Sequence, residues 1–567
     1  LAQTVSVTGV VKDASGEPII GASVVEAGTT NGIVTDLDGN FKLNVSAKGS
    51  LKISFIGYQT QTIPVAGKKQ FDITLKEDAK VLDEVVVVGY GQMKRSDLTG
   101  SVVSVNDEAI KKSVVTSVDQ VLQGRAAGVQ VQANSGMPGG SSSIRIRGIN
   151  SLNASNEPIF VIDGVIIDGS TGSGSDNALA SINPSDIVSM DVLKDASATA
   201  IYGARAANGV IMITTKRGQK GEAQITYDGY IGWQEMPKKL DMLNLREYAE
   251  HKNVRSGKDY SGNDWGIVNK DNNFVRPDLL GEGTDWQDEI FRTAISTNHN
   301  VSIQGGLKNM PYRVSLGFED NNGIVKTTWM KRFNTSVNVA PSFLDKHLNF
   351  NFTAKYMFEK DRYSKVGDAI GNALSMDPTQ PVYGNGEDYK YVGGYFQYLQ
   401  NKSDQISDPD WKKMAASQVT QNPVAVLDNY KCIAKSNDIS GNLEVDYKIH
   451  GFEDLHLHAA IGAQYTDGKQ NEDISKYSFS NNYFGYYGTD HQYKYSIEGK
   501  AFAEYAHKFG VHDIDIMAGA EQSHYHRTGY NYGTGIDEYL KANNPLYETT
   551  EGKWNYEHDP VSKDDEM

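Results

Sequence analysis

The chain has 567 residues, a formal net charge of -16 at pH 7, 39% hydrophobic residues and 56 glycines. The acidic balance argues against a dedicated nucleic-acid binder, which presents a basic face, and no apolar run reaches the roughly 18 residues of a transmembrane helix. The single cysteine, Cys432, excludes an intramolecular disulfide and a cysteine-based zinc cage. Abundant glycine and aromatic residues favour extended β structure with many turns.

Residues 5–77 are predicted to fold as a small β-sandwich. Short alternating segments such as 41–45 are separated by turn signals such as the DLDGN run at 36–40. About seven short strands in this length are typical of two packed sheets. The aspartates of the DLDGN run lack the helices and distal glutamate of a calcium loop, so we interpret this run as a hairpin turn.

Residues 78–92 are predicted to be a linker that carries one β-strand. Four valines follow two acidic residues in the run Asp83, Glu84, Val85, Val86, Val87 and Val88. A valine run forms strands readily. Taken alone, it fits either a buried strand of a domain or a detachable strand that pairs with the sheet edge of a partner through main-chain hydrogen bonds.

Residues 93–220 are predicted to form a compact α/β domain. Apolar spacing predicts a helix over 117–122, and an alanine-rich stretch predicts a second helix over 195–202 that Gly203 ends. Arg145, Arg147 and Arg205 stand among apolar strand residues. Buried charges need partners, so these arginines either pair with carboxylates of a surrounding barrel or are solvated.

The motifs of these segments resemble two known families. The runs GVV at 9–11, PIIGASV at 18–24 and FIGY at 55–58 resemble the carboxypeptidase-regulatory-like, transthyretin-type domain. The runs LQGRAAGVQV at 122–131 and PIFVIDG at 158–164, with the segment 182–218, resemble the plug of TonB-dependent receptors, and in detail the SusC/RagA family of TonB-linked outer-membrane transporters.

This resemblance assigns roles to particular residues. It implies that residues 83–88 are the TonB box, which binds the periplasmic C-terminal domain of TonB. It implies no cofactor. The positions that carry the plug signature are Arg145, Arg147, Asp163, Gly164, Tyr202, Gly203 and Arg205.

Residues 221–567 are predicted to contribute long strands to a transmembrane β-barrel. Runs of about ten residues alternate between apolar and polar side chains, which is the signature of membrane-spanning strands. Connections after even-numbered strands are short, and most of those after odd-numbered strands are long. The strands are expected to start near Ala223, Ser296, Pro311, Trp329, Lys346, Asn437, Asp454, Gln492 and His512.

The predicted fold class is mainly β: a small transthyretin-like β-sandwich, an α/β plug domain, and the N-terminal part of a 22-stranded transmembrane β-barrel. About nine strands are too few to close a barrel around a plug, and an open sheet edge is not tolerated in lipid. We therefore expect the barrel of 221–567 to be truncated in this chain.

Two pairs of histidines, His456 with His458 and His524 with His526, each share one face of a strand. No carboxylate cluster evident in the sequence completes a metal site, so no metal is expected, and these side chains are interpreted as lumen-facing or interfacial. No nucleophile elbow, P-loop or HExxH motif occurs, so the chain is not expected to be an enzyme.

The resemblance implies TonB-dependent import of a large nutrient across the cell outer membrane, with a SusD-like surface lipoprotein as partner and an oligosaccharide as the expected cargo. Aromatic residues of the long loops, among them Trp265, Tyr391 and Trp411, suit sugar rings, although they also suit packing within the loops. A peptide importer, a siderophore receptor and a non-transporting outer-membrane binding protein stay open. The substrate-binding residues are unknown, and no nucleic-acid partner is expected.

Overall fold

The computed structural model divides the chain into two compact units, residues 1–99 and 100–567. Beyond residue 535 it describes only 554–556 and 565–566, and short gaps interrupt the rest. The longer gaps within 4–535 are 55–60, 76–84, 95–101, 111–117, 168–176, 252–266, 269–273, 276–282, 403–410 and 479–484.

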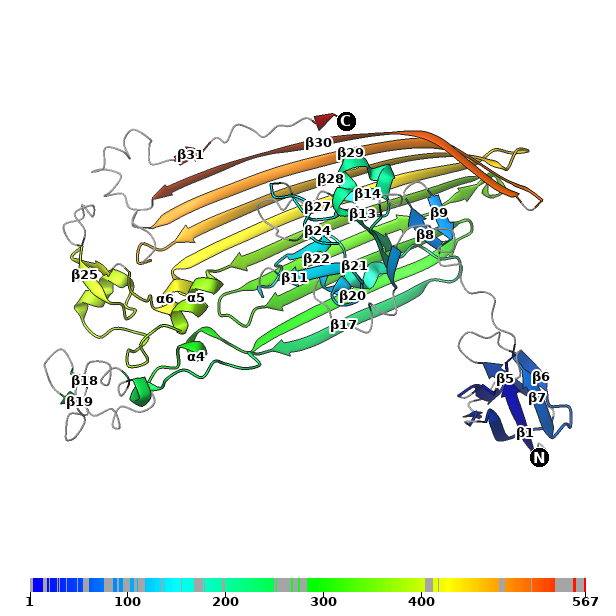
Figure 1. The fold of residues 1–567 in the computed structure, drawn as a ribbon, viewed down its shortest axis with the longest axis horizontal. Helices are drawn as coiled ribbons and strands as arrows, with labels where there is room; N and C mark the ends of the chain where they lie inside the picture. The colour runs from blue at the N-terminus through cyan, green and yellow to red at the C-terminus, as the bar shows by residue number, and fades with distance from the viewer. Residues whose placement is uncertain are drawn as a thin grey trace. The chain divides into compact units, whose positions relative to one another are not determined.

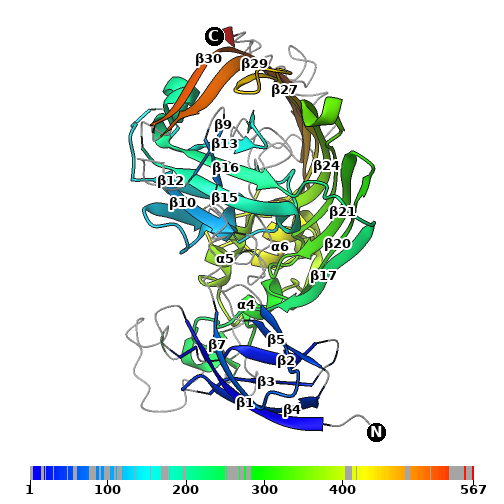
Figure 2. The same cartoon turned by 90° about the vertical axis from the view of Figure 1, so that its right-hand side faces the viewer.

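The first unit contains the predicted sandwich (Figure 2). A three-stranded sheet has the order β4-β1-β7, and a four-stranded sheet has the order β3-β2-β5-β6. Alternate apolar side chains of both sheets, such as Val7, Leu51 and Ile53, are fully buried in one core, because successive strand residues point to opposite faces. The strands are β1 (Thr4–Lys12), β2 (Ser23–Glu26), β3 (Gly32–Val34), β4 (Asn40–Ser46), β5 (Ser50–Ser54), β6 (Gln61–Pro64) and β7 (Gln70–Thr74).

The second unit begins with the plug, built on a five-stranded mixed sheet of order β10-β15-β16-β13-β14 and a separate β11-β12 pair. Its strands are rich in valine and isoleucine, and an apolar core lies between the sheet and the segments that cover it. The elements are β10 (Val102–Asn106), η2 (Asp119–Leu122), β11 (Val129–Ala133), β12 (Ser142–Ile146), β13 (Ile159–Ile162), β14 (Val165–Ile167), η3 (Pro184–Asp186), β15 (Ile187–Leu193), η4 (Ala200–Asn208) and β16 (Val210–Thr215).

The plug helices differ from the sequence prediction. The first predicted helix is a short 3-10 turn at η2, and residues 196–198 of the second lie outside the described part. Gly203 does not end the second helical segment, which continues to Asn208. It forms a kink there, with φ 58° and ψ −149°. Glycine adopts this positive φ without the steric cost that a Cβ would bring, so the chain turns and then resumes its helical path.

Long antiparallel strands form a curved wall, and the plug lies on its concave side (Figures 1 and 2). Each strand pairs with its sequence neighbour, in the order β17-β20-β21-β22-β24-β27-β28-β29-β30. The strands are β17 (Gln224–Gln234), β20 (Ala294–Leu307), β21 (Met310–Asn322), β22 (Trp329–Val339), β24 (Leu348–Tyr363), β27 (Tyr430–Lys448), β28 (Leu455–Ile474), β29 (Tyr486–Phe509) and β30 (His512–Gly535).

These nine long strands of the described residues are the ones predicted, and the mainly β fold class is confirmed. Two of them begin earlier than expected, β27 at Tyr430 and β29 at Tyr486. Polar and apolar side chains are mixed on both faces of their first residues, so the clear alternation used for prediction starts only farther along. The pattern located the alternating part of each strand and not its mixed extension.

Six small elements lie around the wall. β23 (Ser342–Phe343) and η6 (Leu344–Lys346) lie beside the turn before β24. β18 (Ile267–Val268) pairs with β19 (Phe274–Val275) within a long loop, and β31 (Trp554–Tyr556) and β32 (Asp565–Glu566) pair with β30. No helix in the described residues is long and apolar enough to cross a membrane.

The two ends of the wall differ. One end carries short turns such as 308–309 and 449–454, and the other carries the loops between β17 and β20 and between β24 and β27, with helices that pack on an apolar core around Trp286 and Leu427 (Figure 1). The loop elements are α4 (Trp286–Ile290), α5 (Val366–Ala373), η7 (Glu387–Val392), β25 (Leu399–Asn401), β26 (Lys413–Ala415) and α6 (Pro423–Asp428).

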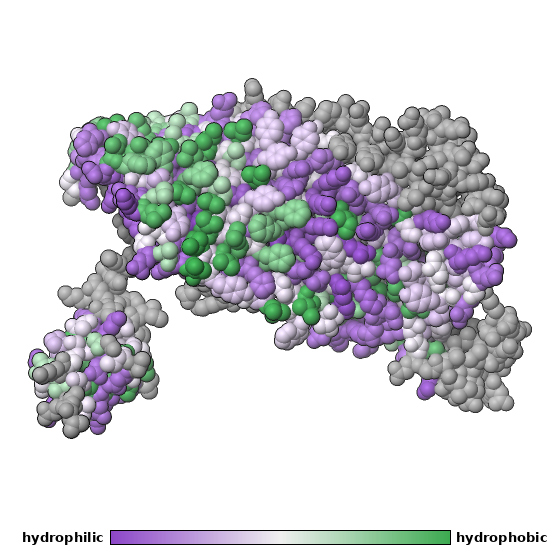
Figure 3. All heavy atoms as spheres, turned by 180° about the vertical axis from the view of Figure 1, so that it is seen from behind, coloured by the Kyte–Doolittle hydropathy of each residue, from purple (hydrophilic) through white to green (hydrophobic). Residues whose placement is uncertain are grey.

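The convex face of the wall presents apolar side chains to the outside. Ile225, Trp233, Ile461 and Ile516 are more than half exposed there. In Figure 3 such residues form a band toward the short-turn end, whereas the end beside the long loops is hydrophilic. An exposed apolar band of this extent marks a surface that is covered in use.

Candidate functional site

The interface between the plug and the wall is polar. On β27, alternate residues face the plug, and Asn442 and Glu444 among them contact it. On β28, Gly462 faces the plug so closely that a Cβ there would lie 2.7 Å from Cγ2 of Val165. Alternation therefore gives the wall an outer apolar face and an inner polar face.

The turn between β13 and β14 is the centre of this interface. Asp163 and Gly164 both have positive φ, 48° and 87°, which turns the chain sharply and aims the Asp163 carboxylate back at the sheet. That carboxylate accepts a hydrogen bond from the backbone N–H of Thr215 at 2.9 Å and one from its hydroxyl at 2.6 Å. It also forms an ion pair with Lys355 of β24, and both side chains are more than 90% buried.

The groups around the Asp163 carboxyl favour its ionised form. Burial alone would raise the pKa of the Asp163 carboxyl, but the Lys355 ammonium and the two Thr215 hydrogen bonds favour the ionised form and hold its pKa below the ordinary value. The wall also grips the turn through its backbone, because Asn442 Nδ2 donates to the Asp163 carbonyl at 2.9 Å. The turn is therefore a charged and hydrogen-bonded contact between plug and wall.

A second buried ion pair lies at the start of β15. Asp186 closes η3, where Asn183 caps the N-terminus, and its carboxylate pairs with Arg313 of β21. The same carboxylate accepts a hydrogen bond from Ser315 Oγ at 2.5 Å. Plug and wall are thus joined by two buried carboxylate–cation pairs, in which the plug supplies the acid and the wall supplies the base.

A third contact joins the plug to the last long strands. Arg205 of η4 donates from Nη2 to Ser523 Oγ at 2.9 Å, donates to the Tyr525 hydroxyl, and lies 5.0 Å from the centroid of the Tyr525 ring. Tyr525 in turn donates to Glu498 at 2.7 Å, and the other Glu498 oxygen accepts from Ile166 N–H at 3.1 Å.

The remaining signature residues have other roles. Arg147 pairs with Asp195 at 2.6 Å and donates to the Lys194 carbonyl at 3.1 Å, so it braces the plug internally. Tyr202 contacts Met212 Sδ at 4.0 Å, also within the plug. Arg145 lies on β12 opposite Gln130 of β11. Of the predicted set, Asp163, Gly164 and Arg205 lie against wall residues.

The sequence did not lead us to four residues of these contacts, namely Asp186, Arg313, Lys355 and Glu498. From the sequence, any such pair was expected to join arginines of the plug to carboxylates of the wall. In the two buried pairs the plug supplies the carboxylate and the wall supplies the cation. One weaker contact has the expected polarity, between Arg217 and Glu444 at 3.9 Å. A charged residue at an alternating position within a long strand is the signal that could have found them.

The valine run does form a strand. Residues Val85–Val88 are β8 and pair with β9 (Gly91–Lys94) in an antiparallel hairpin, with Val85 opposite Lys94. Asp83 and Glu84 lie outside the described residues. The role of residues 83–88 as a partner-binding strand stays a prediction.

Aromatic residues of the long loops gather at the long-loop end of the wall. Trp286, Tyr389 and Phe396 are buried in the loop core, as packing predicts. Trp411 instead stacks on Tyr477 with centroids 6.0 Å apart, and Lys476 Nζ lies 5.8 Å from the Trp411 centroid. Trp265 lies outside the described residues.

Two segments of the chain match known domain families. Residues 94–210 match the TonB-dependent Receptor Plug Domain, and residues 7–87 match the CarboxypepD_reg-like domain. The TonB-dependent receptor SusC of Bacteroides thetaiotaomicron is 49% identical over 95% of this chain and 52% of its own length. The TonB-dependent receptor P26 of Formosa agariphila is 34% identical over 83% of this chain and 44% of its own length.

The fold is also found among solved structures. The RagAB peptide importer in its open-open state matches with a TM-score of 0.62 and 24% identity, over 80% of this chain and 50% of that chain. Its closed-closed state matches with a TM-score of 0.58 and 23% identity, over 77% of this chain and 48% of that chain. The chain spans about half the length of the curated relatives it matches.

Proposed function

Because this chain belongs to the SusC/RagA family of TonB-dependent receptors, we propose that it serves the TonB-dependent active import of a large nutrient across the cell outer membrane. The family resemblance found in the sequence is confirmed by these relatives, and so is the expectation of a receptor and not an enzyme. The apolar band on the convex face supports a lipid-facing wall.

The main support for this function is the polar interface between plug and wall. Water can replace ion pairs and hydrogen bonds when such an interface opens, whereas an apolar interface would lose its whole burial energy. Asp163, Asp186 and Arg205 can therefore hold the plug in the wall and still release it.

The chain path gives TonB a place to pull. The strand β8 precedes β10, the first strand of the plug, and among the described residues β10 is an edge strand of its sheet, paired with β15. A partner strand added to residues 83–88 would gain main-chain hydrogen bonds. Tension passed along the chain would then enter the plug sheet at Val102 and separate β10 from β15 one residue pair at a time.

The cargo is proposed to be an oligosaccharide, captured at the long-loop end together with a SusD-like lipoprotein. The stacked Trp411 and Tyr477 beside Lys476 present aromatic faces and a polar neighbour, which suits sugar rings. A peptide is the alternative cargo, because a structure with the same fold is named a peptide importer. A siderophore receptor and a non-transporting binding protein are further alternatives.

Deleting residues 83–88 tests the coupling. We expect uptake of labelled oligosaccharide by intact cells to be abolished while surface binding persists. A matched pair of substitutions refines the test: Val87→Pro removes a strand hydrogen-bond donor and should abolish uptake, whereas Val87→Thr keeps a β-branched strand former and should preserve it. Unchanged uptake in the deletion would rule out the proposed TonB coupling.

A further inference from the structure

Two histidines and one aspartate meet at the short-turn end of the wall. Asp446 lies near the end of β27, and His456 and His458 lie at the start of β28, across the connection 449–454. His458 is directly opposite Asp446 in the strand register. All three share the alternating positions of Asn442 and Gly462, so they face the plug side of the wall.

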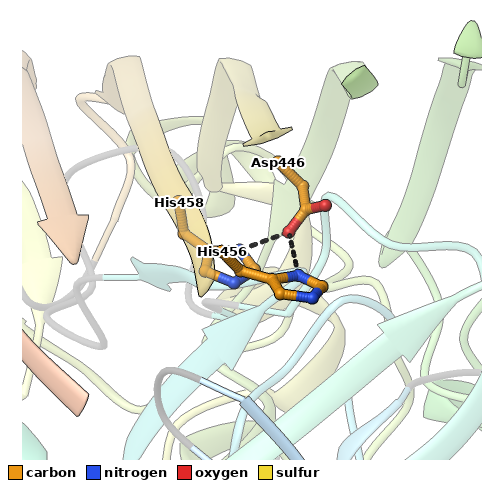
Figure 4. Close-up of side chains that lie close together, drawn as sticks. All are labelled: Asp446, His456 and His458. Carbon is orange, nitrogen blue, oxygen red and sulfur yellow. Dashed lines mark ion pairs between the residues drawn. The ribbon is translucent and has the colours of Figure 1, made fainter. Parts of the chain in front are cut away.

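The three side chains converge on one point (Figure 4). Asp446 Oδ2 lies 2.8 Å from His458 Nδ1 and 3.6 Å from His456 Nδ1. One ligand atom from each residue lies within 4.8 Å of the others. Tetrahedral zinc with bonds of about 2.1 Å separates its ligand atoms by about 3.4 Å, so small side-chain shifts would seat an ion.

Two neighbours on β29 support the arrangement. Glu504 Oε2 lies 3.2 Å from His458 Nε2, the ring nitrogen that does not face Asp446, although the two atoms are not aligned for a hydrogen bond. Phe502 stacks on the His458 ring, with centroids 4.4 Å apart and planes at 19°. A small rotation of the His458 ring would let Glu504 accept from Nε2, and a carboxylate that does so fixes the tautomer and leaves the other nitrogen as a lone-pair donor, the usual outer-shell arrangement at metal sites.

We propose that Asp446, His456 and His458 bind one divalent transition-metal ion of the zinc class on the plug side of the wall. Two imidazoles favour zinc, nickel or cobalt over calcium and magnesium, which prefer oxygen ligands. The fourth position is left to water. Glu504 is a positioning residue, because it acts through His458.

Strand pairing makes the site local. β27 and β28 are each paired on both sides, with β24 and β29, so the three ligands sit on fixed neighbouring strands. A bound ion would tie the two strands together beside their turn and place a positive charge on the plug side of the wall. The site is independent of the proposed import, since it needs neither the strand at 83–88 nor a cargo.

The test is a titration of the receptor purified in detergent and stripped with a chelator. We expect one equivalent of Zn²⁺ to bind by calorimetry, and Co²⁺ to give the intense visible absorption of a tetrahedral site. Asp446→Asn and His458→Ala should each remove the stoichiometric binding. Glu504→Gln should weaken zinc affinity about 10- to 100-fold.

A matched control is available on the other face of the wall. His524 and His526 form a second histidine pair on β30, and they point away from the plug because Ser523 and Tyr525 between and beside them contact Arg205. His524→Ala with His526→Ala should leave zinc binding unchanged. If His458→Ala does not fold, Asp446→Asn and Glu504→Gln decide the matter, since both preserve side-chain shape.

Three results would overturn the proposal. If the stripped receptor bound no stoichiometric zinc, the cluster would be an ordinary ion-pair network. If calcium or magnesium competed equally with zinc, the proposed metal class would be wrong. If the control on β30 lost as much zinc binding as Asp446→Asn, the metal would bind elsewhere.

Discussion

The interface between the two sheets of the N-terminal sandwich is apolar, whereas the interface between plug and wall is polar. The two sandwich sheets meet through fully buried aliphatic side chains such as Val24, Leu51 and Ile53. The plug meets the wall through carboxylates, cations and hydroxyls at Asp163 and Asp186. Opening the apolar interface would expose its side chains to water at a large cost in free energy. In the polar interface, water can replace the hydrogen-bond and ion-pair partners that separate.

The plug combines an apolar core with a polar outer interface. Its own sheet is packed on an apolar core that includes Ile187, Met190 and Ile211, so the strands are held together as the sandwich is. Its contacts with the wall, in contrast, are mainly polar. A domain of this construction can leave a wall as a partly intact body, which is what the proposed import requires.

The largest expected effect comes from unpairing a buried charge. Asp163→Asn leaves the buried Lys355 ammonium without the carboxylate that pairs with it, and we expect it to destabilise the plug–wall contact by about 3–5 kcal/mol. The measurement is hydrogen exchange of residues 159–167 in the purified receptor. Adding Lys355→Met should recover most of the loss, because the buried ammonium that lost its partner is then removed as well.

The sandwich offers the matched control. Lys12 and Asp72 form an ion pair at 3.2 Å whose side chains are 36% and 71% exposed. Asp72→Asn should change stability by less than about 1 kcal/mol, because solvent screens an exposed pair. Equal effects of Asp72→Asn and Asp163→Asn would contradict the distinction between the two interfaces.

Truncating the apolar interface should have the next largest effect. Ile53→Ala deletes part of a side chain with no exposed surface and should cost the sandwich about 2–5 kcal/mol. Limited proteolysis of the receptor, followed at residues 4–75, measures it. Val34→Ala, at a position 62% exposed on β3, should stay within about 0.5 kcal/mol of the parent chain.

A smaller effect should appear with pH. The pKa of Asp163 is lower in the folded protein than its ordinary value of about 3.9, so its contribution is complete above that value and is lost as pH falls through the folded pKa. The stability difference between the parent chain and Asp163→Asn should therefore be constant from pH 7 to about 5 and shrink below about pH 4. Denaturation midpoints across this range measure it, and a difference that grows toward low pH would contradict the assignment.

Much of this architecture could be predicted because alternation is a local signal. The nine long strands and the sandwich follow from residues that repeat every second position, as at 455–465. The starts of β27 and β29 were missed because polar and apolar side chains are mixed on both faces there. The kink at Gly203 was missed because a glycine can either end or bend a helix, and the residues after it decide between the two.

The functional contacts were harder to predict because they join distant parts of the chain. Asp163 and Lys355 are 192 residues apart, and Asp186 and Arg313 are 127 apart. No local pattern marks which plug charge meets which wall charge. Asp446 is different, since the hairpin register alone places it opposite His458, so the metal-ligand cluster was within reach of sequence reasoning.

The most direct test of the account is a reversible tether between plug and wall. A Cβ at Gly462 would lie 3.5 Å from Cβ of Val165, within the range of a disulfide, and the natural Cys432 is buried. Uptake is measured in the Val165→Cys, Gly462→Cys receptor under oxidising and reducing conditions, with each single variant as control. We expect no uptake when the tether is closed and restored uptake on reduction; full uptake by the closed, cross-linked receptor would contradict release of the plug from the wall.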